Sequence, residues 1–209
     1  MPRLIALLAT ACFLIPLDSQ AQGRFEITPY AAYSMGGSFS DTEDIVDISL
    51  VDSQSFGMIL NMRHTAQTQW EFIYSQQNTD ARIRGGDLDG ERLDTDVRYY
   101  QLGGTYQGEG QLGRPFMSAT LGVSQFDVRE PGYDSETYFG FSIGGGLQMW
   151  PTNRLGVRLE ARAFGTLVRS DSSLFCSSDP GGGQAGCALT LAGDVLWQFQ
   201  AMAGLVFRF

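Results

Sequence analysis

The chain has 209 residues, 43% of them hydrophobic and 12% aromatic, and its formal net charge at pH 7 is −9. This acidic balance argues against nucleic-acid binding, which needs clustered positive charge. All fourteen basic residues are arginines, glycine is abundant with 26 residues, and no stretch beyond the N-terminal segment is long and apolar enough for a transmembrane helix.

The N-terminal segment is typical of a secretory signal. Arg3 supplies an early positive charge, an apolar run covers residues 4–17, and the small-residue sequence "SQA" follows as a cleavage site. We expect residues 1–21 to be a signal peptide that is removed, and residues 22–209 to form one exported β-barrel domain. A lipoprotein signal at Cys12 is the alternative, but the apolar run continues past this residue. An exported chain without a transmembrane helix is periplasmic, extracellular or an outer-membrane barrel.

Beyond this segment, apolar and polar residues alternate with period two, and the helical period is absent. The seventh segment, for example, places Val157 and Leu159 on one face and Arg158 on the other. Eight segments follow this pattern: 24–35, 55–63, 69–76, 97–106, 115–126, 138–150, 155–164 and 195–209.

The connections between these segments alternate in length. Short ones cover 64–68, 107–113 and 150–154, and long ones cover approximately 36–54, 79–95, 127–136 and 167–194. This alternation and an even strand number are typical of a bacterial outer-membrane barrel. The sequence therefore predicts an all-β fold, an eight-stranded antiparallel up-and-down transmembrane β-barrel with both termini at the periplasmic, short-turn end. A soluble lipocalin-type barrel or β-sandwich also alternates, but the polar face here is too small and too neutral for a water-facing wall.

Aromatic residues at the strand ends support the same orientation. We expect two girdles, one at each membrane interface. The periplasmic girdle would contain Phe25, Trp70, Tyr106, Phe116, Trp150, Phe207 and Phe209. The outer girdle would contain Tyr33, Phe56, Tyr74, Tyr100, Phe126, Phe139, Phe164 and Trp197.

Two cysteines remain after the signal segment, Cys176 and Cys187, in "CSSDPGGGQAGC". In an oxidising compartment such a pair is expected to form a disulfide that closes a short loop. A free thiol pair or a metal site is the alternative, although neither a histidine nor a third cysteine lies nearby in the sequence.

Charged residues recur on the polar faces of the first, third, seventh and eighth segments. Because the eighth strand closes on the first, Glu26 is expected to approach Arg208. Charges that face a narrow lumen are tolerated only when they are paired and hydrogen-bonded, so we expect a salt-bridge network that fills the barrel. A gate in a small-solute pathway is the alternative, and an open pore is disfavoured because eight strands enclose little volume. The predicted lumen charge network consists of Glu26, Glu71, Arg158, Glu160, Arg162 and Arg208.

The long loops are acidic, and the second one offers Asp87, Asp89 and Glu91 as candidate ligands for a hard cation such as calcium. The sequence "DLDGE" lacks the twelfth-position Glu of an EF-hand, so a solvated acidic loop is the preferred interpretation and no cofactor is expected. Catalysis is not expected either. The single histidine, His64, lies in a short periplasmic turn, whereas a Ser–His or His–Asp mechanism on outer-leaflet lipid needs it at the opposite end.

The strand pattern, the hairpin "GGGLQMWPTNRLGVRLEARAF" and the terminal "FRF" resemble the family of small outer-membrane β-barrels. This family includes the transmembrane domain of outer-membrane protein A and the outer-membrane proteins X and W, and the resemblance runs from about Arg24 to Phe209. It implies that Phe207 and Phe209 belong to the signal read by the outer-membrane assembly machinery. No peptidoglycan-binding domain follows in this sequence, so cell-wall anchoring is not carried over.

We therefore expect an outer-membrane protein of a Gram-negative-type bacterium, with a plugged polar interior, acidic extracellular loops and a structural or surface-interaction role. The expected partners are outer-membrane lipid and lipopolysaccharide, the assembly machinery, and an extracellular ligand or surface, and we expect a monomer. One alternative is a narrow, porin-like channel for small or hydrophobic solutes, as the resemblance to outer-membrane protein W implies. The other is a lipid-modifying outer-membrane enzyme, because one barrel fold hosts many functions.

Overall fold

The computed structural model describes residues 24–40, 47–84, 92–110, 113–129, 135–168, 176–178, 184–187 and 195–209, so the predicted signal peptide lies outside the described residues. Its eight long strands are β1 (Phe25–Gly36), β4 (Ser53–Arg63), β5 (Thr68–Arg84), β6 (Arg92–Gln107), β7 (Arg114–Val128), β8 (Glu136–Met149), β9 (Leu155–Leu167) and β12 (Val195–Arg208). The short strands are β2 (Ser38–Ser40), β3 (Asp47–Leu50), β10 (Cys176–Ser178) and β11 (Gln184–Cys187). Within these ranges no helix is long and apolar enough to cross a membrane.

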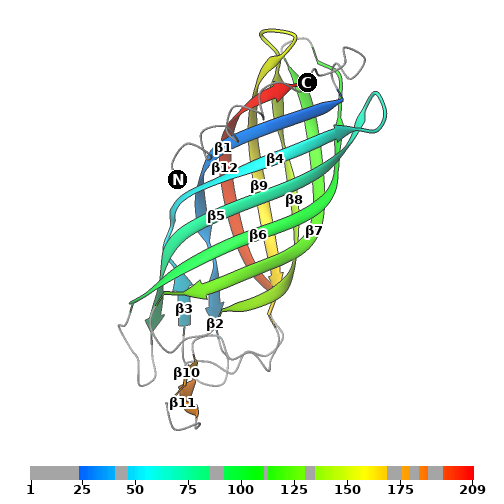
Figure 1. The fold of residues 1–209 in the computed structure, drawn as a ribbon. Coiled ribbons are helices and arrows are strands. Elements are labelled where there is room, and N and C mark those ends of the chain that lie inside the picture. Colours follow the sequence, from blue (N-terminus) through cyan, green and yellow to red (C-terminus); the bar gives the residue numbers. More distant parts are fainter. Residues whose placement is uncertain are drawn as a thin grey trace, which may run out of the picture.

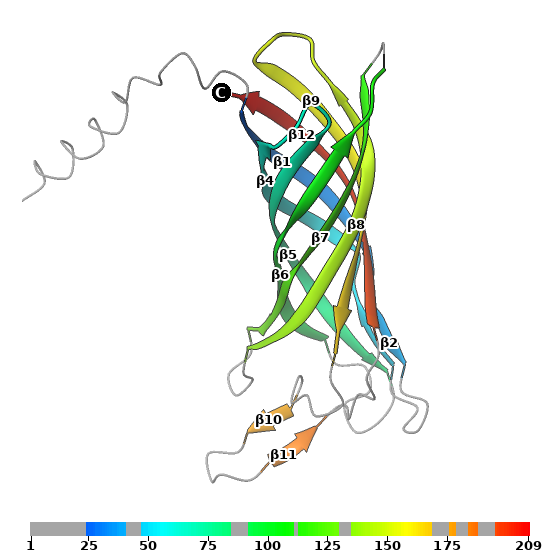
Figure 2. The same ribbon diagram turned by 90° about the vertical axis from the view of Figure 1, so that its right-hand side faces the viewer.

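The eight long strands form a closed antiparallel barrel (Figures 1 and 2). Each long strand pairs with the long strands before and after it in the chain, and β12 closes the barrel on β1, with Glu26 opposite Arg208. Backbone hydrogen bonds between Phe25 and Phe209, at 2.9 and 3.4 Å, end this seam. A closed barrel leaves no free edge strand. The eight-stranded antiparallel up-and-down barrel predicted from the sequence is confirmed.

The short connections β4–β5, β6–β7 and β8–β9 gather at one end of the barrel, together with the C-terminal end of β12 (Figure 2). Local chemistry favours two of these turns. The Thr65 hydroxyl accepts hydrogen bonds from the backbone N–H groups of Gln67 and Thr68, and the Thr152 hydroxyl accepts one from that of Leu155. Side-chain hydroxyls that bond nearby backbone in this way compete with further strand pairing and end the strands.

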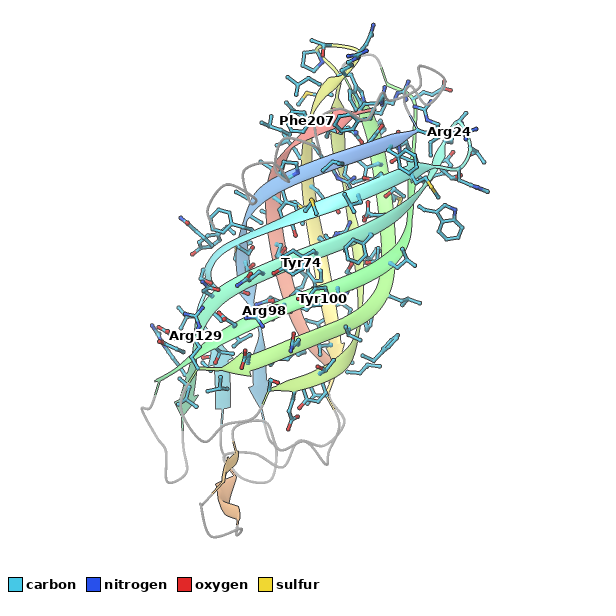
Figure 3. The ribbon with its side chains drawn as sticks, viewed as in Figure 1. Arg24, Tyr74, Arg98, Tyr100, Arg129 and Phe207 are labelled. Atoms are coloured by element: carbon cyan, nitrogen blue, oxygen red, sulfur yellow. The ribbon has the colours of Figure 1, made fainter. Side chains whose placement is uncertain are left out.

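The outer wall of the barrel is apolar and the inner wall is polar over most of its height, as Figure 3 illustrates with its outward side chains. Along β1, Phe25 is 49% exposed and Tyr33 48%, whereas the alternating Glu26 and Thr28 are 2% and 0% exposed. Successive side chains of a strand point to opposite faces, so a period-two sequence gives an apolar exterior and a polar lumen. An exterior of this kind is stable against lipid, where the apolar side chains need no cover.

Beyond the aromatic pair Tyr74 and Tyr100, the wall reverses its polarity. Further along β5 the outward residues are polar, such as Asn78 and Asp80, while the lumen side carries the buried Ala81. The same lumen region holds a core of Leu50, Leu93, Val97, Val128, Val168 and Leu196. The reversal marks the height at which the barrel wall changes from a lipid-type to a water-type surface.

This reversal explains why two strands are longer than the sequence predicted. Part of the expected loop 79–95 is strand, since β5 continues to Arg84 and β6 starts at Arg92. The first expected loop also contains strand: β1 breaks at Gly36 and Gly37, whose φ angles are 82° and 100°, before β2 and β3 pair beyond it. Glycine suits such left-handed positions because it has no Cβ. The strand β3 then pairs with the distal part of β5.

Three residues assigned to the aromatic girdles lie inside the barrel instead, so that part of the prediction is wrong. Phe116, Phe126 and Phe164 are only 4%, 3% and 0% exposed. Phe164 stacks on Tyr99 with ring centroids 4.4 Å apart, and Phe126 meets Tyr138 edge-on at 6.0 Å. Each of the three alternates with outward neighbours, so their parity along the strand decides their side and their height does not.

Candidate functional site

The centre of the lumen is crossed by four charged side chains from two strands. Glu71 comes from β5 and Arg158, Glu160 and Arg162 come from β9, and the pairing order places these strands on opposite sides of the eight-stranded ring. The residues at positions 158, 160 and 162 share one face of β9 because the strand period is two. One charged residue on the opposite wall is then enough to connect the two sides of the lumen, and Glu71 is that residue.

The four side chains form a closed ring of ion pairs, which we call the lumen network. Arg158 Nη2 lies 2.9 Å from Glu71 Oε2, and Arg158 Nε lies 2.8 Å from Glu160 Oε2. Arg162 Nη2 lies 2.5 Å from Glu71 Oε1 and 2.6 Å from Glu160 Oε1. Each carboxylate thus bonds both guanidiniums, and the charges in the ring balance. Buried charges are tolerated when they are paired in this way.

Neutral side chains from the neighbouring strands complete the hydrogen bonds of the lumen network. Asn61 and Thr105 donate to Glu71, at 3.2 and 2.5 Å. Ser142 accepts from Arg162 at 3.0 Å, and the Arg158 guanidinium lies 4.1 Å from the ring centroid of Phe116. These partners were not predicted individually, although their inward parity on the strands could have indicated them. They matter because a buried charge is costly when its remaining donors or acceptors are left unpaired.

The other two predicted charges, Glu26 and Arg208, form a separate pair at the short-turn end. Arg208 donates to Glu26 Oε1 from Nη2 and Nε, at 2.8 and 3.0 Å, and Gln148 donates to Glu26 Oε2 at 3.0 Å. The Arg208 guanidinium also lies 3.5 Å from the ring centroid of Trp150. The pair joins β1 to β12 and so fastens the seam where the barrel closes.

A layer of amides and aromatic rings lies next to the lumen network, on the side of the long-loop end. Tyr99 donates its hydroxyl to Gln198 Oε1 at 2.7 Å, and Gln198 Nε2 donates to Gln77 Oε1 at 2.6 Å. Tyr99 stacks on Phe164, and the apolar core at the long-loop end follows beyond this layer. These residues were not predicted, because only charged residues on the inward faces indicated contacts inside the barrel, and amides carry no charge.

The lumen is packed rather than hollow at the height of the lumen network. The side chains of Glu71, Glu160 and Arg162 are 0% exposed and that of Arg158 is 1% exposed. Side chains that line a water-filled path keep part of their surface accessible to water, and any void that holds a water molecule would add to this exposure. The described side chains therefore close the barrel at this level.

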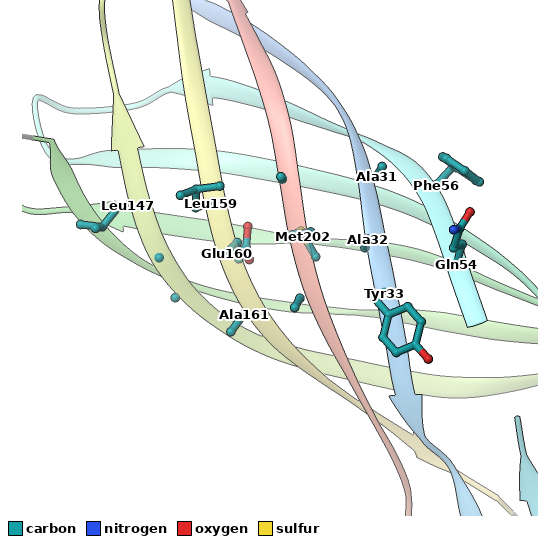
Figure 4. Close-up of a pocket in the computed structure, with 14 residues that line it drawn as sticks. Ala31, Ala32, Tyr33, Gln54, Phe56, Leu147, Leu159, Glu160, Ala161 and Met202 are labelled. Atoms are coloured by element: carbon teal, nitrogen blue, oxygen red, sulfur yellow. The ribbon is translucent and has the colours of Figure 1, made fainter. Parts of the chain in front are cut away.

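A groove of about 830 Å³ lies on the barrel at β8, β9, β12, β1 and β4 (Figure 4). Small outward residues form much of it, among them Ala31 on β1 and Ala161 on β9, and the larger Phe56 and Leu159 border it. Phe56 is 60% exposed and Leu159 45%. The groove therefore opens on the apolar outer wall.

The remaining predicted residues are placed as follows. The candidate cation ligands Asp87, Asp89 and Glu91 lie outside the described residues, and within the described part no group of His, Cys, Asp or Glu side chains is arranged to hold a metal ion. The backbones of Cys176 and Cys187 are paired across β10 and β11, and the disulfide itself stays a prediction. Phe207 and Phe209 are 39% and 48% exposed on the wall. His64 is exposed in its short turn and meets the edge of Trp70.

The closed eight-stranded barrel and its apolar outer wall show that the chain has the fold of the small outer-membrane β-barrels. It is similar to neisserial surface protein A, with 13% identity over 88% of this chain and 97% of that one, and a TM-score of 0.59. It is also similar to the outer membrane protein OprG from Pseudomonas aeruginosa, with 12% identity over 90% of this chain and 97% of that one, and a TM-score of 0.60. No protein-family model matches the sequence. No curated protein matches it.

Proposed function

We propose that the protein is a closed anchor barrel of the bacterial outer membrane that presents long acidic loops to the outside. The observation that carries this proposal is the lumen network, whose four charged side chains are at most 1% exposed. Paired charges that fill the lumen hold opposite walls of the barrel together and leave no path for solute. The useful surface of the barrel is then the set of connections at its long-loop end.

The outer-membrane location is supported by the apolar exterior. Large side chains such as Leu102, Met117 and Leu121 are 60%, 64% and 59% exposed, which a water-facing wall would not tolerate in a continuous band. Two similar structures are those of a neisserial surface protein and of an outer membrane protein. Export would begin with the signal peptide in residues 1–21, and the short-turn end with Phe209 would face the periplasm.

The proposed partners follow from the same arrangement. Outer-membrane lipid and lipopolysaccharide would cover the apolar wall, and the assembly machinery would read Phe207 and Phe209 on the last strand. The long-loop end would meet an extracellular ligand or surface. A closed barrel whose eight long strands are each paired on both sides needs no second copy, so we propose a monomer. No catalytic role is proposed, since the only histidine lies at the short-turn end, away from the acidic loops.

Solute uptake by liposomes distinguishes the anchor from the competing function, a narrow channel for small or hydrophobic solutes. Purified mature protein would be inserted into phosphatidylcholine liposomes, and both swelling in arabinose and entry of a hydrophobic fluorescent dye would be measured. We expect rates equal to those of protein-free liposomes, because the lumen network leaves no water-wide path. Protein-dependent uptake of either solute would overturn the anchor and favour the channel. A known porin in the same liposomes serves as the positive control.

A further inference from the structure

Among the described residues, the short-turn rim carries four exposed arginines without carboxylate partners. Arg24 precedes β1, Arg63 ends β4, Arg114 begins β7 and Arg154 precedes β9, and all four are exposed. None of them takes part in an ion pair among the described residues. Figure 3 shows Arg24 and Phe207 at this rim, and Arg98 and Arg129 at the opposite end of the barrel.

Strand pairing gathers most of these charges into one arc. The backbone N–H of Arg63 donates to the carbonyl of Arg24 at 2.8 Å, and that of Arg208 donates to the carbonyl of Arg154 at 2.9 Å. The consecutive strands β4, β1, β12 and β9 therefore each carry an arginine at this rim, of which only Arg208 is paired, with Glu26. Arg114 adds a further positive charge two strands away from β9.

Little negative charge opposes this arc. In the described part of the chain, the acidic side chains at this rim are Glu26, which is bonded to Arg208, and the exposed Glu109. The carboxylate of Phe209 lies there as well. At the other end Arg129 lies 2.6 Å and Arg98 3.2 Å from the buried Asp96, whereas Arg82 takes part in no ion pair among the described residues. Among the described residues, Arg98 and Arg129 at the long-loop end are thus paired with carboxylates, whereas the four arginines of the short-turn rim are not.

The position of the arc along the barrel axis indicates which chemical group it would bind. Each free arginine is adjacent in sequence to an exposed residue of the wall, as Arg24 is to Phe25 and Arg63 is to Met62. The four positions have the inward parity of their strands, yet all four side chains are exposed at the height where the apolar wall ends. Long arginine side chains extend from such rim positions to the headgroup layer. Phosphate at this depth belongs to lipid headgroups, and guanidinium recognises phosphate through paired N–H donors.

We propose that this arc binds the phosphates of anionic phospholipids in the inner leaflet. This inference rests on the proposed membrane location. Anionic lipid attracts a basic residue near the surface with an energy equivalent to about a fivefold preference for each arginine. The inner rim would thereby collect anionic phospholipid around the barrel and hold the short-turn end in the periplasmic interface.

Lipid selectivity tests the proposal directly. The mature protein would be inserted into phosphatidylcholine vesicles, and the association of spin-labelled phosphatidylglycerol relative to spin-labelled phosphatidylcholine would be measured by electron spin resonance. At low salt we expect a severalfold preference for phosphatidylglycerol, which falls towards one in 0.5 M salt as the charges are screened, to a Debye length of roughly 4 Å. The combined Arg24→Gln, Arg63→Gln and Arg154→Gln variant should have lost most of this preference at low salt, because only Arg114 remains free at the rim.

Two matched variants separate charge at the arc from other effects. Arg24→Lys, Arg63→Lys and Arg154→Lys together should keep most of the preference, and Arg129→Gln at the opposite rim should keep all of it. Equal selectivity of the wild type and the glutamine variant, or equal loss in Arg129→Gln, would overturn the inference. Protease protection in pure phosphatidylcholine vesicles is measured first. A chain that does not insert there contradicts the proposed membrane location, whereas a chain that inserts without lipid preference contradicts only this inference.

Discussion

Replacing Glu71 by glutamine is expected to lower the free energy of unfolding by about 3–5 kcal/mol, the range found when a buried ion pair loses one partner. Glu71 is fully buried and bonds both Arg158 and Arg162. Glutamine keeps the size of the side chain and can still accept from Thr105, but it leaves one excess positive charge in the lumen. Urea titration of the protein in lipid vesicles, followed by tryptophan fluorescence, measures the change.

Two controls make this result specific to the lumen network. Glu109→Gln removes the same charge from an exposed turn and should change stability by less than about 0.5 kcal/mol. Adding Arg162→Gln to Glu71→Gln restores charge balance, so the double variant should be more stable than the sum of the two single changes predicts. If Glu71→Gln were as stable as Glu109→Gln, the lumen network would not hold the barrel together.

Replacing Gly103 by alanine is expected to cost at least about 2 kcal/mol, in the range of overpacking a tight site. A Cβ at this position would overlap the backbone oxygen of Ala119 and lie 2.6 Å from Thr120 Cα, both on β7. Backbone atoms cannot rotate away as a flexible side chain can, so β6 and β7 would have to separate. The same urea titration would show the loss.

The adjacent glycine supplies the control for this substitution. A Cβ at Gly104 would find its nearest contact, the carbonyl oxygen of Gln69, at 3.4 Å, which is ordinary packing distance. Both changes restrict the unfolded chain equally, so the difference between them reports the folded wall alone. Gly104→Ala should leave stability within about 0.5 kcal/mol of wild type. Equal effects of the two substitutions would contradict the close approach of β6 and β7.

Strand positions were predictable wherever one face of a strand was continuously apolar. In β1 the outward residues from Phe25 to Tyr33 keep the period-two pattern without a break, and the expected and observed strands agree. The distal parts of β5 and β6 were missed because polar residues such as Asn78 and Asp80 take the outward positions there. Alternation continues there with its polarity reversed, so apolar residues no longer mark the outward face of the strand.

The lumen network could be predicted only in part. Charge on the inward faces indicated which residues would meet inside, and seam closure suggested Glu26 and Arg208 as partners, which lie 2.8 Å apart in the structure. Which strand lies across the lumen follows from the ring order, but the relative height of side chains on opposite walls depends on the stagger of the strands. That stagger is set by all the registers together, so the contacts of Glu71 with Arg158 and Arg162 required the structure.

The closed lumen is tested most directly by recording current across a planar lipid bilayer that contains the purified mature protein. Insertion would be established on the same preparation by the different gel mobility of heated and unheated samples. Because the lumen network fills the barrel, we predict that the wild-type protein leaves the bilayer at its baseline conductance over the usual voltage range. Reproducible steps of steady conductance from the inserted wild-type protein would contradict the closed barrel.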